Sequence, residues 1–316
     1  MRIKNGLRHG SSFDEKSGHN VQKAYAEHEN MHRIDYYLAE GCTRPGFETW
    51  LTILNASIGG EKGDPPKEEC YVNLQIDYTT NEGVVASKTY PLPMQARTTI
   101  NVNAEIGGGY DVSFKMRSVS NMYRTNIRVY IERPMYFSYG GLGGHEPWQG
   151  GHVNTASNAF DYEDQVLVTK QYFAEGTTRP GFEEWICVLN PNDEPTKLTF
   201  NYMIQGVGLE THVETLAAKH RGTWYVPNHV GMNRDVSLEL VSDQPVLAER
   251  PMYFAYGSVS RPGHTWYGGH ITTGIAEQKI PNGYINTFAF APLAYVSGMG
   301  WGGPIPGSAC RTRMTL

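Results

Sequence analysis

The chain has 316 residues, of which 40% are hydrophobic and 19% are charged, and its formal net charge is −5. This composition excludes a disordered chain. The small negative net charge gives no excess of positive charge that would attract nucleic acid or an anionic membrane. No apolar run approaches the roughly 18 residues that span a bilayer, so we expect no membrane insertion. The many glycines and tyrosines favour β-strands joined by tight turns.

Residues 1–34 contain no apolar stretch of the kind found in signal peptides. If the chain is complete as written, we therefore expect a cytoplasmic protein. Within this segment, only Val21–His32 has apolar spacing that fits a helix of more than two turns, and Ser17–Val21 resembles the end of a preceding repeat. We interpret residues 1–34 as a remnant of, or linker from, an earlier module of a longer exported protein.

The phrase A-E-G-x-T-R-P-G-F-E-x-W occurs twice, at Ala39–Trp50 and at Ala174–Trp185. Its Arg-Pro-Gly sequence predicts a type II turn, because proline presets the first central residue and glycine accepts the positive φ of the second. The arginine before the proline is expected to point outward. The alternative is that this phrase rims a ligand surface, whose candidate residues are Arg44, Glu48, Arg179 and Glu183.

Between the repeated phrases, apolar residues alternate with polar ones. Val72–Tyr78, Lys197–Met203 and Asp235–Asp243 each show this period of two, which predicts antiparallel strands with one solvated face. The first copy is longer than the second, and its extra residues fall in two expected loops, Ser57–Glu69 and Ser120–Arg128. About seven short strands per copy predict an all-β fold of two tandem antiparallel β-sandwich modules.

A second phrase, E-R-P-M-Y-F-x-Y-G, occurs at Glu132–Gly140 and Glu249–Gly257, and each copy places an arginine within an apolar stripe. A buried guanidinium needs an acceptor, and the acid of the first phrase is the candidate. We therefore predict ion pairs within each module, Arg133 with Glu40 and Arg250 with Glu175. These pairs serve either as structural clamps or as the floor of a ligand pocket. The proline after each arginine predicts an edge strand or a bulge.

Each second phrase is followed by a tryptophan and by Gly-Gly-His. Trp148 with His152, and Trp266 with His270, are candidate ligand-binding residues, since aromatic faces stack on sugar rings. Metal ligation would need three converging ligands, and no closely spaced histidine pair supplies them, so we expect no metal.

The four cysteines, Cys42, Cys70, Cys187 and Cys310, lack metal-type spacing. Free buried thiols are expected, with a Cys42–Cys70 bridge as the alternative. Known catalytic motifs are missing, so we expect no enzyme, no catalytic residue and no cofactor, with a hydrolase that uses two carboxylates as the alternative. The expected organisation is a remnant or linker (1–34), the first module (35–155), a linker (156–167), the second module (168–275) and an irregular tail (276–316).

The two phrases resemble tandem modules of large, mostly uncharacterised bacterial surface and secreted proteins, over about 35–155 and 168–275. More loosely, the modules are similar to the β-sandwich of the sensory rhodopsin transducer family. The resemblance implies a jelly-roll-like sandwich, oligomerisation and an extracellular or cell-surface location, and it brings no catalytic residues.

The expected function is a non-catalytic structural or adhesive repeat. The alternative is a pair of modules that bind carbohydrate, such as a cell-wall or extracellular glycan. The expected partners are neighbouring modules of the same array, and glycans or other surface proteins, rather than nucleic acid.

Overall fold

The structure, a computed structural model, describes residues 32–142, 144, 146–158, 167–257 and 262–276. Within these residues most of the chain forms strands, and the paired strands are antiparallel, which confirms the expected all-β class. The helical stretch expected over 21–32 lies outside the described residues except for His32, which begins the first strand. The described residues belong to one compact unit.

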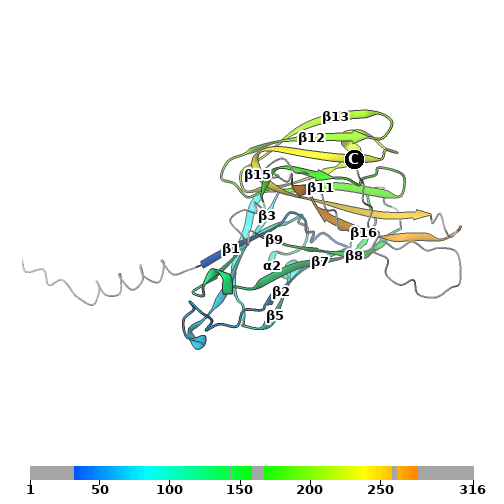
Figure 1. Cartoon of the computed structure of the whole chain (residues 1–316). Coiled ribbons are helices and arrows are strands. Elements are labelled where there is room, and N and C mark those ends of the chain that lie inside the picture. Colours follow the sequence, from blue (N-terminus) through cyan, green and yellow to red (C-terminus); the bar gives the residue numbers. More distant parts are fainter. Residues whose placement is uncertain (1–31, 143, 145, 159–166, 258–261, 277–316) are drawn as a thin grey trace, which may run out of the picture. The chain divides into compact units, whose positions relative to one another are not determined.

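We call the strands β1 to β9 the first module. One sheet has the strand order β4-β3-β6-β1-β9. The other has the order β5-β2-β7-β8, whose strands are labelled in Figure 1. The strands are β1 (His32–Leu38), β2 (Phe47–Asn55), β3 (Val72–Thr80), β4 (Gly83–Pro91), β5 (Ala96–Asn101), β6 (Ser113–Ser120), β7 (Val129–Tyr139), β8 (Trp148–Thr155) and β9 (Ser157–Asn158). A short helix, α2 (Val102–Ile106), follows β5.

We call the strands β10 to β17 the second module, and they repeat this order strand for strand. The sheets are β13-β12-β15-β10-β17 and β14-β11-β15-β16, with α3 (Val226–Val230) after β14. The strands are β10 (Val168–Phe173), β11 (Phe182–Asn190), β12 (Thr196–Ile204), β13 (Gly208–Leu216), β14 (His220–Tyr225), β15 (Val236–Gly257), β16 (Thr265–Thr273) and β17 (Ile275–Ala276). The long β15 replaces β6 and β7 and runs through both sheets.

Strands with alternating burial form each sandwich core. In β12 the buried residues Leu198, Phe200 and Tyr202 alternate with polar ones, and they pack in one cluster with Ile186 and Val188 of the other sheet. The first module has an equivalent cluster between its two sheets. Burial of these apolar stripes is the main force that holds each pair of sheets together.

The strands extend slightly past the module limits expected from the sequence. Ser157–Asn158, expected in a linker, pairs with β1, and Ile275–Ala276 pairs with β10. The first module therefore covers residues 32–158, and the second covers 168–276. Residues 1–31, the remaining linker residues 159–166 and the tail 277–316 lie outside the described residues.

The two extra segments of the first module bind each other. Arg128 makes a two-pronged ion pair with Glu61, at 2.8 and 2.9 Å. Asp64 accepts hydrogen bonds from the backbone N–H of Tyr123 and from the Asn126 amide. Insertions that are separate in the sequence thus form one structure beside β6 and β7.

The edge or bulge predicted at each Arg-Pro is wrong. Pro134 lies in β7, an interior strand between β2 and β8. Pairing of β2 with β7 runs from Phe47 to Thr49 and resumes in the same register at Thr52, so the ladder is interrupted opposite the proline. An interior strand tolerates this proline because only the bonds toward β2 are lost, while pairing with β8 continues.

Candidate functional site

The repeated Arg-Pro-Gly sequence forms the predicted type II turn in both modules. Phe47 N–H donates to the Arg44 carbonyl at 2.9 Å, and Gly46 has φ of 89°. A Cβ on Gly46 would lie 2.4 Å from the Ser138 carbonyl oxygen, so only glycine fits the turn against β7. Arg44 is exposed and pairs with Asp111 at 2.6 Å, and Arg179 makes the equivalent ion pair with Asp235.

The structure brings together both of the acid and arginine pairs expected from the sequence. In the first module the Arg133 guanidinium is fully buried and donates to the side chain and the carbonyl of Glu40. In the second module Arg250 contacts Glu175 through a 2.6 Å ion pair, but the Glu175 side chain is 62% exposed. The pairs therefore share geometry and differ in environment.

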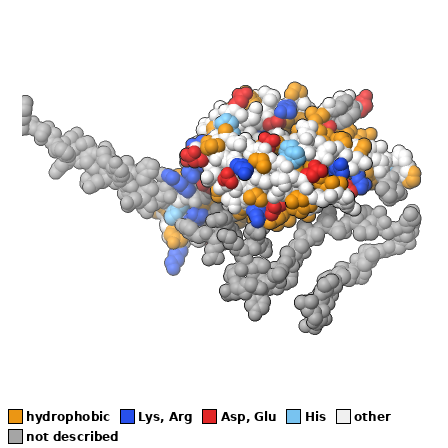
Figure 2. Space-filling view, turned by 90° about the horizontal axis from the view of Figure 1, so that it is seen from above, with side chains coloured by type: hydrophobic (Ala, Val, Ile, Leu, Met, Phe, Trp, Pro, Cys, Tyr) orange, Lys and Arg blue, Asp and Glu red, His pale blue; other side chains and the backbone are white. Residues whose placement is uncertain are grey.

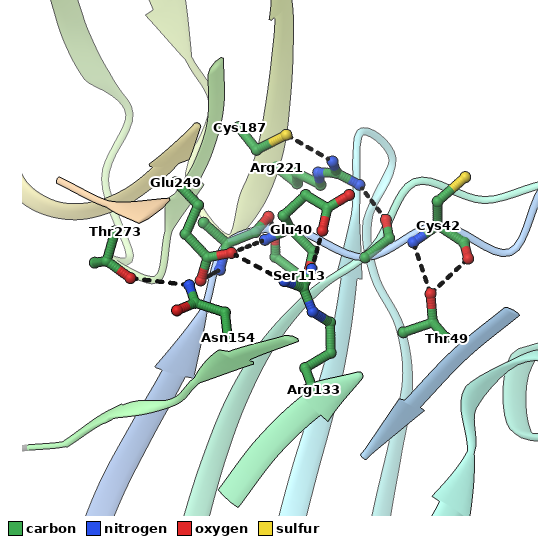
Figure 3. A network of polar contacts seen from close by, with 12 residues as sticks. Glu40, Cys42, Thr49, Ser113, Arg133, Asn154, Cys187, Arg221, Glu249 and Thr273 are labelled. Carbon is green, nitrogen blue, oxygen red and sulfur yellow. Dashed lines mark hydrogen bonds and ion pairs between the residues drawn. The ribbon is translucent and has the colours of Figure 1, made fainter. Parts of the chain in front are cut away.

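This difference arises because the second module covers the first pair. Glu249, which is fully buried, lies 3.8 Å from Arg133 and accepts hydrogen bonds from the backbone N–H groups of Ala39 and Glu40 (Figure 3). Burial raises the pKa of Glu249, against the opposing effect of the Arg133 guanidinium. The pair expected within one module is thus part of a network between two modules.

A second buried arginine crosses the same contact. Arg221 of β14 donates to the Gly41 carbonyl at 2.9 Å and to the Cys187 sulfur at 3.1 Å. Two guanidinium groups and two carboxylates, Arg133, Arg221, Glu40 and Glu249, therefore lie close together, and their formal charges cancel when both acids are ionised. Such compensation is needed for charges removed from water.

Sequence reasoning missed the roles of Glu249 and Arg221. Each residue has a counterpart in the other module, Glu132 and Arg97, so the repeat could have identified them as candidates. Their apolar neighbours gave no sign that a second module would cover them, because strand periodicity reports which face a residue is on and not what packs against that face.

Aromatic rings surround the polar network. Tyr253 of the second module packs edge to face on Phe137 with ring centres 4.9 Å apart, and it also contacts Phe47 and Tyr139. Strands β8 and β16 pack together beside this cluster, where the Asn154 amide donates to the Thr273 hydroxyl at 3.0 Å. The contact between the modules is therefore an apolar cluster around a charged centre.

We name the two sides of this contact. The receiving cleft belongs to the first module and comprises Glu40, Cys42, Arg44, Phe47, Asp111 and Tyr139. The docking face belongs to the second module and comprises Trp185, Cys187, Arg221, Glu249, Pro251 and Tyr253. Between them remains a cavity of about 60 Å³, so the docking face nearly fills the cleft.

The tryptophan and histidine expected to bind ligand also differ between modules. Trp148 is buried in the aromatic cluster, and both ring nitrogens of His152 are buried. Burial, together with the Arg133 guanidinium, holds the pKa of His152 well below its usual range. In contrast, Trp266 is 43% exposed, and the His270 ring lies 3.7 Å from Glu175.

The glutamate that follows the turn also has a different environment in each module. Glu48 is exposed and, with Arg44, lines an open cleft of about 790 Å³ that Trp148 and His152 do not line. Glu183 is buried and accepts a hydrogen bond from the Leu142 N–H of the first module. The next residue, Glu184, is also buried, and burial raises its pKa to about 8. The eight candidate ligand residues therefore do not form one site in either module.

The thiols are free in the part of the chain that the structure describes. Cys42 and Cys187 are buried on opposite sides of the module contact, while Cys70 is half-buried. Burial raises the pKa of Cys42 to about 12, which makes this thiol a poor nucleophile. The described residues hold no group of three histidine, cysteine or acidic side chains suited to a metal, and no helix among them is long and apolar enough to cross a bilayer.

Charges of both signs are interspersed on the surface seen in Figure 2, with apolar side chains between them. No patch of a single charge sign dominates the face seen there. Among the described residues, the groups that stand out chemically are the buried charges at the contact between modules. The equivalent residues on the opposite module are the second such set.

No protein-family model matches the chain, and no curated protein matches it. Among solved structures, the chain is similar to the crystal structure of Thermotoga maritima 1070, with 17% identity and a TM-score of 0.31, over 36% of this chain and 97% of that one. The Anabaena sensory rhodopsin transducer is a weak structural neighbour, with 18% identity and a TM-score of 0.25, over 28% of this chain and 99% of that one.

Proposed function

We propose that the protein is a non-catalytic structural element of stacked β-sandwich modules, and part of a bacterial cell-surface or secreted protein. The observation that supports this best is the burial of the repeated charged residues where the modules meet. Arg133, Glu40 and Glu249 contact each other there. Because all three side chains are buried, a substrate in solution could not reach them. In this proposal the repeated phrases fasten one module to the next.

The charged network also has a role that an apolar contact would lack. Burying ions without partners is costly, so only an alignment that brings Arg133 between Glu40 and Glu249 is stable. An apolar surface would tolerate sliding of one module over the other. We therefore assign to the network the alignment of the two modules.

The proposal is tested by replacing Arg133 with methionine and following urea unfolding by circular dichroism and tryptophan fluorescence. Removal of one partner from a buried ion pair costs about 3–5 kcal/mol, so a large loss of stability is expected. The control is Arg44→Met, which removes an exposed arginine whose pair is worth about 1 kcal/mol or less. If the two variants unfold alike, the network does not fasten the modules.

The proposed location has its own test. A biotin reagent that cannot cross membranes should label the protein on intact producing cells. Labelling that requires lysis of the cells would refute a surface location and leave the structural role untouched.

Carbohydrate binding is the second candidate, and one observation favours it. In the second module Trp266 and Tyr256 expose aromatic surface near an open cleft of about 1100 Å³ lined by Glu175, Arg179 and Phe182. Aromatic faces beside carboxylates suit pyranose rings. Structural packing remains the preferred function, because protein side chains fill the equivalent cleft of the first module.

A glycan array separates the two candidates. If the second module binds sugar, the protein should retain a specific glycan, and Trp266→Ala should abolish that signal. Tyr130→Ala is the matched control, since Tyr130 is an exposed aromatic residue of the first module, far along β7 from the turn. If the array retains no glycan, carbohydrate binding is rejected and only the structural function remains.

A further inference from the structure

Within the described residues, each side of the module contact occurs twice, and one copy of each takes part in the contact. The first module carries a counterpart of the docking face on its own outer sheet surface. Its residues are Trp50, Thr52, Arg97, Glu132, Pro134 and Tyr136, as set by the repeated phrases and by the strand register, in which Leu54 pairs with Arg97 as Leu189 pairs with Arg221. We call this surface the free face.

The second module likewise carries a counterpart of the receiving cleft. Its residues are Glu175, Thr177, Arg179, Phe182, Asp235 and Tyr256, and we call it the free cleft. The isolated bridge that links Cys42 to Asp111 in the first module recurs between Thr177 and Asp235, so the two clefts have the same backbone frame. The described residues thus include two surfaces outside the module contact whose residues match those of its two sides.

Exposure shows that both surfaces are open. Tyr253 is 5% exposed in the docking face, whereas its counterpart Tyr136 is 56% exposed, and Leu189 at 1% contrasts with Leu54 at 47%. On the other side, Ala39 is fully buried and Ala174 is exposed. The free cleft has a volume of about 1100 Å³, against about 60 Å³ in the receiving cleft once the docking face fills it.

The free surfaces also keep the chemical groups that make the existing contact. Arg97, Glu132 and Tyr136 are the same residue types as Arg221, Glu249 and Tyr253. In the free cleft, the Gly176 carbonyl accepts from Val236 N–H, as the Gly41 carbonyl accepts from Val112 N–H in addition to Arg221. A carbonyl oxygen has two lone pairs, so the Gly176 carbonyl can accept a second donor.

We propose that the free cleft of one molecule binds the free face of a second copy of this chain, head to tail. In this assembly Arg97 donates to the Gly176 carbonyl, and Glu132 accepts from the N–H groups of Ala174 and Glu175. Tyr136 packs among Phe182 and the rings beside it. The inference rests on the proposed structural function, because it extends the same contact from neighbouring modules to neighbouring molecules.

The geometry of this contact determines the kind of assembly. The two sides are different surfaces, so the interface is heterologous, and a bound copy again presents one free face and one free cleft. Repetition gives a linear chain of molecules or a closed ring, and it gives no dimer with twofold symmetry. Side chains from both sides would be buried as they are within one chain.

Sedimentation velocity of the full chain, over a wide range of concentrations, tests this assembly. Glu132→Lys should block the free face, Ala174→Arg should block the free cleft, and each should weaken association by roughly 100-fold, as expected at a central contact. Both positions are exposed, so the variants should unfold like the wild type. Val213→Lys, an exposed position on β13 away from both surfaces, is the matched control and should associate normally.

Mixing the two blocked variants gives the sharpest result. Each keeps one intact surface, so the equimolar mixture should form a dimer and nothing larger.

A wild type that stays monomeric, an assembly that persists in either variant, or a mixture that stays monomeric would each overturn the proposal. If the wild type is monomeric but Arg133→Met is strongly destabilised, self-assembly fails while the structural function stands. Thr99 is exposed and pairs with Thr52 of the free face, so Thr99→Arg is a second block of that face. If it also leaves association unchanged, the interface lies elsewhere.

Discussion

The two modules have the same strand order and similar phrases, yet equivalent residues have opposite environments. Glu249 is fully buried and binds two backbone N–H groups, whereas Glu132 is exposed. Conversely, Arg133 is enclosed by acids from both modules, while Arg250 pairs with an acid that is open to solvent. A residue's role in this chain therefore depends on which neighbour covers it as much as on its place in the repeat.

The largest expected difference between modules concerns the equivalent tyrosines. Tyr253→Ala removes a ring from the aromatic cluster and should lower the free energy of unfolding by about 3–5 kcal/mol, as for other large buried aromatics. Tyr136→Ala should change it by about 0.5 kcal/mol or less, because Tyr136 is exposed. Urea unfolding of dilute protein measures both, and equal losses would contradict the difference in burial.

The equivalent arginines should show the next largest difference. Arg221→Ala leaves the Gly41 carbonyl without one of its donors in a buried place, which should cost about 1–3 kcal/mol. Arg97→Ala alters an exposed side chain and should leave the stability of dilute protein unchanged. Thermal unfolding at low concentration, where molecules do not associate, compares them. An Arg221 variant as stable as the wild type would mean that water replaces the lost donor.

The equivalent histidines predict a pH effect. Burial keeps the folded-state pKa of His152 below its unfolded value, so its contribution to stability is present above about pH 6.5 and is lost as the pH falls toward the folded-state pKa. Between pH 6.5 and 5.5 the loss should approach about 1.4 kcal/mol per pH unit. His152→Gln should remove this slope, and His270→Gln, at a more exposed ring, should change it less. Unfolding midpoints at both pH values provide the check.

The smallest expected effect concerns the insertions, which only the first module has. Glu61→Ala removes the partially exposed pair with Arg128 and should cost about 0.2–1 kcal/mol. Hydrogen exchange should show faster opening near residues 57–69 and 120–128, with the second module unchanged. Faster exchange across both modules would mean that the insertions support the whole chain.

The sequence predicted the features that depend on local pattern. Alternation identified the strand that became β12, the Pro-Gly step identified the turn at Gly46, and an arginine in an apolar stripe led to Arg133 and its acid. These features follow from periodicity, from backbone sterics and from the cost of an unpaired buried charge.

The features that escaped prediction depend on contacts between modules. Nothing local distinguishes Glu249 from Glu132, because their strands have nearly the same residues and only the neighbouring module differs. The position of Pro134 was also missed, since an interior strand can lose its pairing on one side of a proline and keep it on the other. The order of strands in a sheet is a tertiary property. The preference of proline for edge strands therefore predicted the wrong position for β7 in its sheet.

The unbroken β15 has a mechanical consequence. In the second module one unbroken strand pairs in both sheets, whereas in the first module the loop 121–128 separates β6 from β7. Tension applied along the chain therefore loads both sheets of the second module together, but it can open the sheets of the first module one at a time. Single-molecule stretching should record this as two force peaks from the first module and one from the second.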